Sequence, residues 1–185
     1  KGLACLVEPS SSPTVQRMKR AIKKKYPELL WVEYAPLDNV NERAALAHAF
    51  GGNWRAIADY GHAEVIVSLD FDFLGVSPTQ VPDTRGWAKG RKPNSHSMNR
   101  LLVAEPSLTV TGSKADERVA VKPSRIEVLA QAIASKYAGI SHGDISLSLD
   151  EQTWLDLVTE SLDNAHQGHG LVVVGASQPP VVHYL

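Results

Sequence analysis

The sequence predicts a three-layer αβα fold of the α/β class, built on a mostly parallel, doubly wound sheet. Short apolar runs alternate with segments of helical periodicity, and this order requires crossover connections between parallel strands. Residues 63–69 (AEVIVSL) are almost continuously apolar, as in a parallel strand covered on both faces. With 185 residues, of which 43% are hydrophobic, the chain can bury a sizeable core. We therefore expect a single α/β domain over residues 1–185.

The first strand is predicted at residues 2–7, a short apolar run that a segment rich in proline and serine ends. Ser12 as N-cap and Pro13 in the first turn then favour a helix. This helix should extend to about Lys25, because the Tyr-Pro pair at 26–27 disfavours its continuation.

The second strand is predicted at residues 29–34 (LLWVEY), which are rich in aromatic and β-branched side chains. Asp38 or Asn39 is a candidate cap for the helix that follows, and the glycine pair at 51–52 should end it. The apolar run at 63–69 is the third strand. Strand and helix thus alternate through the first third of the chain.

Residues 78–98 combine prolines and glycines with basic and histidine side chains, so we expect an exposed excursion there. One short helix is predicted within it, from about Val81 to Lys89. The apolar run at 101–104 predicts the fourth strand, and residues 118–121 predict a short fifth strand.

A helix follows the fifth strand. Ser124 is its candidate N-cap, because Glu127 stands three residues later, at the capping-box position. Its buried face is expected from the apolar residues at helical spacing, which are Ile126, Leu129, Ala130 and Ile133.

After a loop at 138–146, a long helix is predicted from Leu149 to a stop at Gly168. Its buried stripe should come from Trp154, Leu155, Leu157, Val158 and Leu162. The last strand is predicted at 171–174, and residues 178–185 begin a further helix.

Composition excludes several classes of function. The chain has 19 basic and 20 acidic residues, so we expect neither a nucleic-acid partner nor an anionic membrane surface. The basic run from Arg17 to Lys25 is interpreted as the solvated face of a helix. Because Cys5 is the single cysteine, it forms no intrachain disulfide and no cysteine-ligated metal centre. No apolar run approaches ~18 residues, so we expect no direct membrane insertion and no signal peptide.

Both ends of the sequence fall close to predicted elements. KGLACLV enters a strand at once, and QPPVVHYL stops soon after a helix begins. We interpret the chain as an excised piece of a longer protein, whose compartment signals could lie outside it.

Ligands of parallel α/β sheets sit beyond the carboxyl ends of the strands, so the residues that follow each strand are the candidates for cofactor binding. They are Ser10, Asp70, Asp72, Glu105, Ser107, Gly175 and Ser177. A dinucleotide-binding fingerprint would place glycines after the first strand, but the segment EPSSSP has none.

The acidic pair Asp70 and Asp72 has two interpretations. The two carboxylates could hold a metal or serve as acid and base, or they could accept hydrogen bonds from loop amides and helix N-termini. We favour the second, because no histidine or third carboxylate is near in sequence. His166 and His169 form only a weak metal pair, since Gly168 lies between them. We therefore expect no catalytic residue and no metal site.

The segment at 101–134, LLVAEPSLTVTGSKADERVAVKPSRIEVLAQAIA, resembles the molybdopterin oxidoreductase superfamily. In that family a strand ending in Asp-Pro-Arg leads to a Thr/Ala/Asp segment, a short strand and a Pro-Gly-Thr-Asp helix start. LVEPSSSPT, SLDFDFLG and GHGLVVVGASQPPVVHYL extend the likeness over nearly the whole chain. Together these motifs are most similar to the molybdopterin-oxidoreductase-like domain of the iron–sulfur subunit of bacterial alternative complex III, which oxidises quinol.

The chain departs from the family at the residues that hold the cofactor. In the molybdopterin enzymes, the Asp-Pro-Arg and Gly-Thr-Asp turns help to bind a guanine dinucleotide. This chain has Glu105-Pro106-Ser107 at the first turn. At the second it has Ser124, which adds a Cβ in place of glycine, and Ile126, which removes a carboxylate acceptor.

The resemblance implies a structural or docking domain with a degenerate cofactor site in a quinol-linked electron-transfer complex. It implies no molybdopterin here, iron–sulfur clusters elsewhere in the full-length subunit, and other subunits of a membrane respiratory complex as partners. The expected location is the periplasmic face of the cytoplasmic membrane. Two alternatives stay open: a domain that still binds molybdopterin guanine dinucleotide or another nucleotide, and a free-standing α/β domain for a small molecule.

Overall fold

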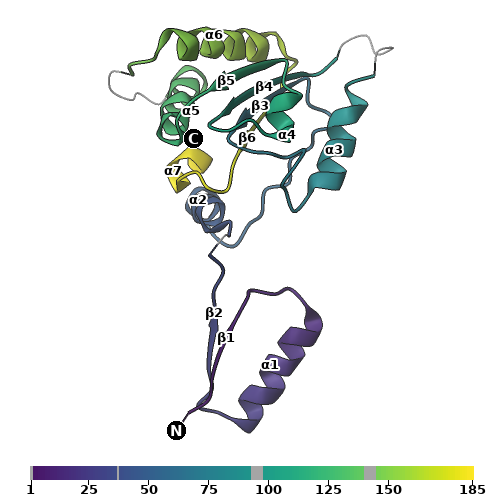
Figure 1. Cartoon of the computed structure of the whole chain (residues 1–185), viewed down its shortest axis with the longest axis vertical. Coiled ribbons are helices and arrows are strands. Elements are labelled where there is room, and N and C mark those ends of the chain that lie inside the picture. The colour runs from purple at the N-terminus through teal and green to yellow at the C-terminus, as the bar shows by residue number, and fades with distance from the viewer. Residues whose placement is uncertain (1, 37, 93–97, 140–144) are drawn as a thin grey trace. The chain divides into compact units, whose positions relative to one another are not determined.

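The computed structural model describes residues 2–36, 38–92, 98–139 and 145–185 (Figure 1). Its described part has the predicted α/β architecture, in which parallel sheets are flanked by helices. The chain divides into two compact units, Lys1–Asp38 and Asn39–Leu185. The single domain expected over residues 1–185 stays a prediction. Parts of the expected excursion and of the loop at 138–146 lie outside the described residues.

The first unit is a βαβ arrangement. It contains β1 (Ala4–Val7), α1 (Pro13–Lys25) and β2 (Leu30–Glu33), and the two strands pair in parallel. Both strands are shorter than predicted, whereas α1 has the predicted bounds. Ser12 occupies the N-cap position of α1, although its side chain makes no capping hydrogen bond. The cations of the basic run are exposed except Lys19, which is half-buried and pairs with Glu33 at 2.7 Å.

The second unit holds a four-stranded parallel sheet with the strand order β5-β4-β3-β6. Its elements are α2 (Val40–Phe50), β3 (Val65–Leu69), α3 (Gln80–Lys89), β4 (Arg100–Glu105), α4 (Val110–Ser113), β5 (Glu117–Ala120), α5 (Pro123–Tyr137), α6 (Leu149–Asn164), β6 (Gly170–Val174) and α7 (Pro180–Tyr184). The chain enters at β3, moves outward through β4 to β5, and then returns to the other side of β3 as β6. This reversal makes the sheet doubly wound, as predicted.

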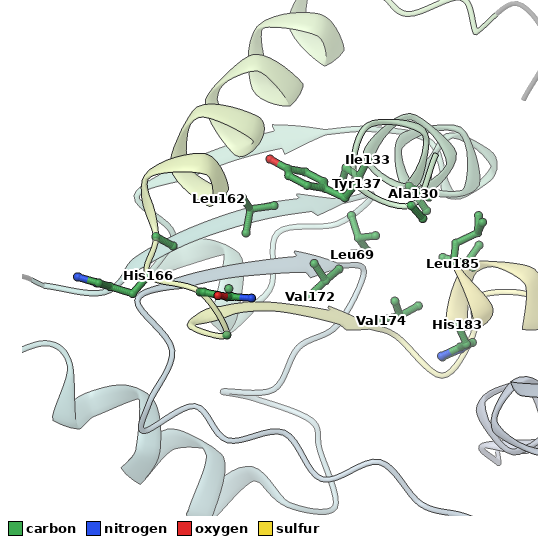
Figure 2. A pocket seen from close by; sticks show the side chains of 17 residues that line it. Leu69, Ala130, Ile133, Tyr137, Leu162, His166, Val172, Val174, His183 and Leu185 are labelled. Carbon is green, nitrogen blue, oxygen red and sulfur yellow. The ribbon is translucent and has the colours of Figure 1, made fainter. Parts of the chain in front are cut away.

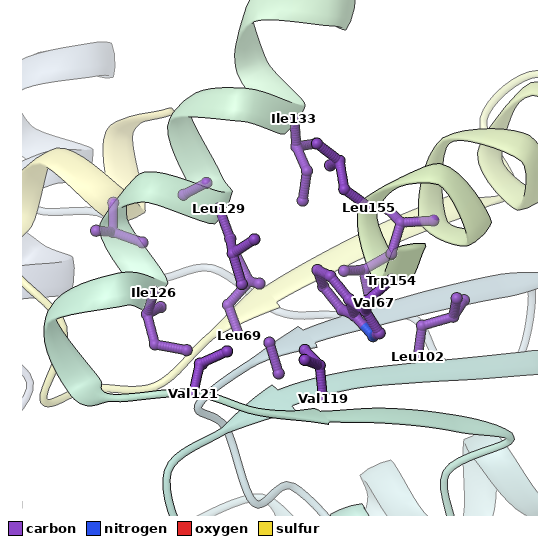
Figure 3. Close-up of a cluster of buried hydrophobic side chains, with 14 of the residues drawn as sticks. Val67, Leu69, Leu102, Val119, Val121, Ile126, Leu129, Ile133, Trp154 and Leu155 are labelled. Atoms are coloured by element: carbon purple, nitrogen blue, oxygen red, sulfur yellow. The ribbon is translucent and has the colours of Figure 1, made fainter. Parts of the chain in front are cut away.

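Side chains alternate between the two faces of this sheet, so each face has its own core. Val67 and Leu69 of β3 point to the face covered by α5 and α6, where they pack with Leu129 and Trp154 (Figure 3). Ile66 of β3 belongs to the opposite cluster, which contains Phe73 and Tyr60 and is flanked by Trp87 of α3. Every residue of β3 is buried, which explains its nearly continuous apolar sequence.

Two predicted helix bounds are wrong. Helix α5 begins at Pro123 with Lys122 as its N-cap, so Ser124 does not cap it. The fixed φ of proline suits the first helical position, and this places Ser124 inside the helix. Helix α6 ends at Asn164 rather than Gly168, because Ala165 already has extended backbone with a ψ of 147°.

The capping box of this protein lies instead at the start of α6. The Ser148 hydroxyl accepts the Glu151 N–H, and the Glu151 carboxylate accepts the Ser148 N–H in return. Glu151 also receives two hydrogen bonds of 2.7 Å from the guanidinium of Arg125 on α5. The Arg125 contact lowers the pKa of Glu151 to about 2, and the Ser148 N–H adds to the effect.

This ion pair predicts acid sensitivity. Because the pKa of Glu151 is about 2 in the folded chain and near 4.5 when unfolded, its contribution is complete above pH 4.5. It is lost as pH falls from about 4.5 toward 2. Glu151→Gln should lower the free energy of unfolding by roughly 2 kcal/mol at pH 7 and by much less at pH 2.5, measured by urea denaturation.

Glu160→Gln is the matched control, because Glu160 is exposed on the same helix. Its effect should stay within about 0.5 kcal/mol at both pH values. An equal loss of stability for Glu151→Gln at pH 7 and pH 2.5 would contradict the assignment.

Candidate functional site

The candidate site lies at the carboxyl ends of β3 and β6, where the winding of the sheet reverses. In open α/β sheets this switch point forms a crevice that ligands occupy. Asp70 follows β3, and Gly175 and Ser177 follow β6, so the fold brings three of the predicted site residues to one place.

Asp70 makes hydrogen bonds to β4 and to the turn before α7. Its N–H donates to the Ala104 carbonyl of β4 at 2.8 Å, and its φ is 56°, a left-handed conformation that aspartate tolerates. The Asp70 carboxylate accepts hydrogen bonds from the Gln178 side chain at 2.7 Å and from the Ser177 hydroxyl at 3.2 Å. Both donors come from the turn before α7, so the carboxylate anchors that turn.

Gly175 lies against Asp70 at the end of β6. Its N–H donates to the Leu69 carbonyl at 2.9 Å, and a Cβ at this position would overlap the carbonyl oxygen of Asp70. Glycine is therefore required here by close contact between two backbone segments. The Asp70 carbonyl oxygen, which Gly175 faces, is an acceptor and cannot donate a hydrogen bond to a phosphate.

Asp72 stabilises the connection that follows β4. Its Oδ1 atom accepts from the Thr111 N–H at 2.9 Å and from the Thr111 hydroxyl at 2.8 Å. The same hydroxyl oxygen accepts the Leu74 N–H at 3.0 Å, and Thr111 is completely buried. Asp72 thus serves a helical turn from another part of the chain, as the hydrogen-bonding interpretation of the acidic pair predicted.

Glu105 acts on the same turn from the end of β4. It is 2% exposed and accepts from the Thr109 N–H at 3.2 Å, from the Thr109 hydroxyl at 2.6 Å and from the Arg118 guanidinium at 2.6 Å. Thr109 caps α4 through a hydrogen bond from the Gly112 N–H. A Cβ at Gly112 would overlap the Glu105 carboxylate. Asp72 and Glu105 therefore both hold α4.

The other two serines of the predicted set are not at the switch point. Ser107 is exposed in the connection between β4 and α4. Ser10 belongs to the first unit, where its hydroxyl accepts the Ser12 N–H at 3.2 Å and its carbonyl accepts from the Gln16 side chain at 3.1 Å. These contacts organise the start of α1.

Sequence reasoning missed α4 and the residues that engage the carboxylates. These are Thr109, Thr111, Arg118 and Gln178. A sequence signal existed for Thr109. Threonine is a preferred N-cap residue, and its hydroxyl can accept the N–H of the residue three positions later, which is Gly112. Gln178 is 108 residues from Asp70, and no local pattern connects them.

His166 and His169 come together around a carboxylate at the opposite end of the sheet. Their Nδ1 atoms lie 2.8 Å and 3.1 Å from the Glu64 carboxylate. The His166 N–H, followed by the imidazoles, lowers the pKa of Glu64. Within the described ranges, no group of three His, Cys, Asp or Glu residues could hold a metal ion.

The fold and site define an α/β domain in which the strand-end carboxylates Asp70, Asp72 and Glu105 accept hydrogen bonds from their own chain. No protein-family model matches the sequence, and no curated protein matches it. No helix among the described residues is long and apolar enough to cross a membrane.

The Glu105 contacts predict a sharp dependence of stability on its charge. Glu105→Gln removes the ion pair with Arg118 and turns one acceptor oxygen into a donor that faces Thr109. The free energy of unfolding should fall by about 1–3 kcal/mol, measured by urea denaturation. Glu117→Gln is the control, because Glu117 is 45% exposed and 3.9 Å from Arg100, and its cost should be below about 0.5 kcal/mol. Equal effects of the two substitutions would refute the structural role of Glu105.

Proposed function

We propose that this chain is a structural and docking domain of a respiratory-complex iron–sulfur subunit related to the molybdopterin oxidoreductases. It takes part in quinol-linked electron transfer by holding other subunits and does not itself catalyse a reaction. The proposal rests on the hydrogen bonds that the strand-end carboxylates accept. Asp70, Asp72 and Glu105 each accept hydrogen bonds from elsewhere in the chain, so the groups best suited to a ligand are already engaged.

A pterin dinucleotide does not fit this donor set. A guanine edge needs a free carboxylate acceptor, and a pyrophosphate needs backbone N–H groups at a close approach. At the switch point, Gly175 meets the carbonyl of Asp70, and the Asp70 carboxylate is shared between Ser177 and Gln178. These contacts support a degenerate cofactor site. The proposal places the iron–sulfur clusters in another part of the full-length subunit.

The position of Ile126 supports the same conclusion. It stands where the related enzymes have the aspartate of their Gly-Thr-Asp turn, and here it is completely buried in the core beside Val121 and Leu129 (Figure 3). A carboxylate could not be buried there without a large free-energy cost. The burial of Ile126 therefore supports the proposed loss of a cofactor ligand at this position.

In this proposal the partners are the other subunits of a membrane respiratory complex, and the domain lies on the periplasmic face of the membrane without entering it. It binds no nucleic acid. The nearly balanced charge and the absence of a membrane-spanning helix from the described residues are compatible with such a role.

The intact subunit, purified from the membranes of its host, tests this function. We expect iron in stoichiometric amount, no stoichiometric molybdenum, and co-purification of partner subunits. Removal of residues 1–185 should abolish the co-purification while the remaining part keeps its iron. Stoichiometric molybdenum, or full assembly of the complex without this domain, would overturn the proposal.

A second candidate is a domain that still binds molybdopterin guanine dinucleotide. It is favoured by one observation, the convergence of Asp70, Gly175 and Ser177 at the switch point of the sheet. Isothermal titration of the folded chain with guanosine diphosphate separates the candidates. Saturable heat that Asp70→Asn removes supports the dinucleotide site, whereas no heat supports the docking domain.

A further inference from the structure

The charges of this chain are unevenly distributed. Residues 1–38 contain seven basic and four acidic residues, whereas residues 39–185 contain 12 basic and 16 acidic residues. The net charge of −1 is therefore the sum of two regions of opposite sign. Because this net charge is small, two copies of the chain repel each other little at long range, and local charges decide whether they associate.

Helix α1 carries six of the seven basic residues of the first region and no acidic residue. Arg17, Arg20 and Lys24 are exposed and follow one another at spacings of three and four residues, so they lie on one side of the helix. We call these three residues the basic face of α1. None of the three forms an ion pair with another described residue.

Helix α6 has the opposite charge, with five acidic residues and no basic residue. Asp156, Glu160 and Asp163 are exposed at spacings of four and three residues, and they form the acidic face of α6. The other side of the helix packs on the sheet, where Val158 belongs to the core and Leu162 lines a cavity over β6 (Figure 2). The acidic face is therefore directed to solvent.

The two faces have the same spacing when the helices run antiparallel. Along α1 the charged residues are separated by three and then four positions, and along α6, in reverse order, they are also separated by three and then four. Both rows thus extend about 4.5 Å and then about 6 Å along the helix axis. The pairs that align are Arg17 with Asp163, Arg20 with Glu160 and Lys24 with Asp156.

The carboxylates of α6 have room for these cations. Glu160 forms no ion pair with another described residue, and Asp156 accepts one hydrogen bond from the Gln152 side chain. Asp163 accepts hydrogen bonds from two side chains of α5. A carboxylate has about four acceptor positions, so each of the three can accept a further donor.

We propose that the basic face of α1 in one copy of this chain binds the acidic face of α6 in a second copy. A nucleic acid or an anionic membrane would also attract α1, but the acidic excess of residues 39–185 repels both. Ion pairs between exposed side chains are individually weak, so the association is weak and depends strongly on salt. It is independent of the function proposed above.

Sedimentation equilibrium of the full chain at pH 7 tests the proposal. In about 20 mM NaCl, the average mass should rise from one copy toward two as the concentration increases to about 1 mM, and in about 500 mM NaCl it should stay at one copy. Arg20→Glu and Glu160→Arg each place like charges opposite one another. Each should lower the association constant about fivefold or more.

The chain that carries both substitutions has the original net charge and a reversed pair, so it should associate as the unchanged chain does. The matched control combines Glu160→Arg with Arg85→Glu, because Arg85 is exposed on α3 and the net charge is again the original one. This control should stay as weak as Glu160→Arg alone.

The proposal is overturned if the average mass stays at one copy throughout in low salt. It is also overturned if the chain with Arg20→Glu and Glu160→Arg associates no better than the control. Binding of duplex DNA or of anionic lipid vesicles by a chain that stays monomeric would identify a polyanion as the partner of α1, which equally contradicts the proposal.

Discussion

The burial of β3 and β4 on both faces is the constraint on which the second unit depends. A parallel strand inside a three-layer sheet can satisfy its backbone only through its neighbours, and its side chains are mostly apolar on both sides. Charged groups are therefore concentrated at the strand ends. There they must find partners within the chain or bind a ligand.

In this protein the strand-end carboxylates find their hydrogen-bond partners within the chain. Asp72 and Glu105 hold α4, and Asp70 holds the turn that leads to α7, so the carboxyl edge of the sheet is closed by its own connections. The proposed docking function rests on these contacts, because the polar groups at this edge of the sheet serve the stability of the fold.

The sequence predicts the strands of the sheet well, because a strand buried on both faces has a nearly continuous apolar run, as at the start of β3. It also predicts that Asp70 and Asp72 accept hydrogen bonds from loop amides or helix N-termini. It does not predict α4, whose four residues are too short for periodicity, or the pairing of Asp70 with Gln178. It places the capping box at Ser124 instead of Ser148, because the local pattern fits both and the proline before Ser124 decides the outcome.

A double-mutant cycle between Asp72 and Thr111 tests the central claim most directly. Asp72→Asn, Thr111→Val and the double variant are compared with the unchanged chain by their free energies of unfolding. If the strand-end carboxylate is committed to the fold, the two changes couple by about 1–2 kcal/mol. Additive effects, within about 0.5 kcal/mol, would mean that Asp72 is not held by Thr111 and would leave it free for a ligand.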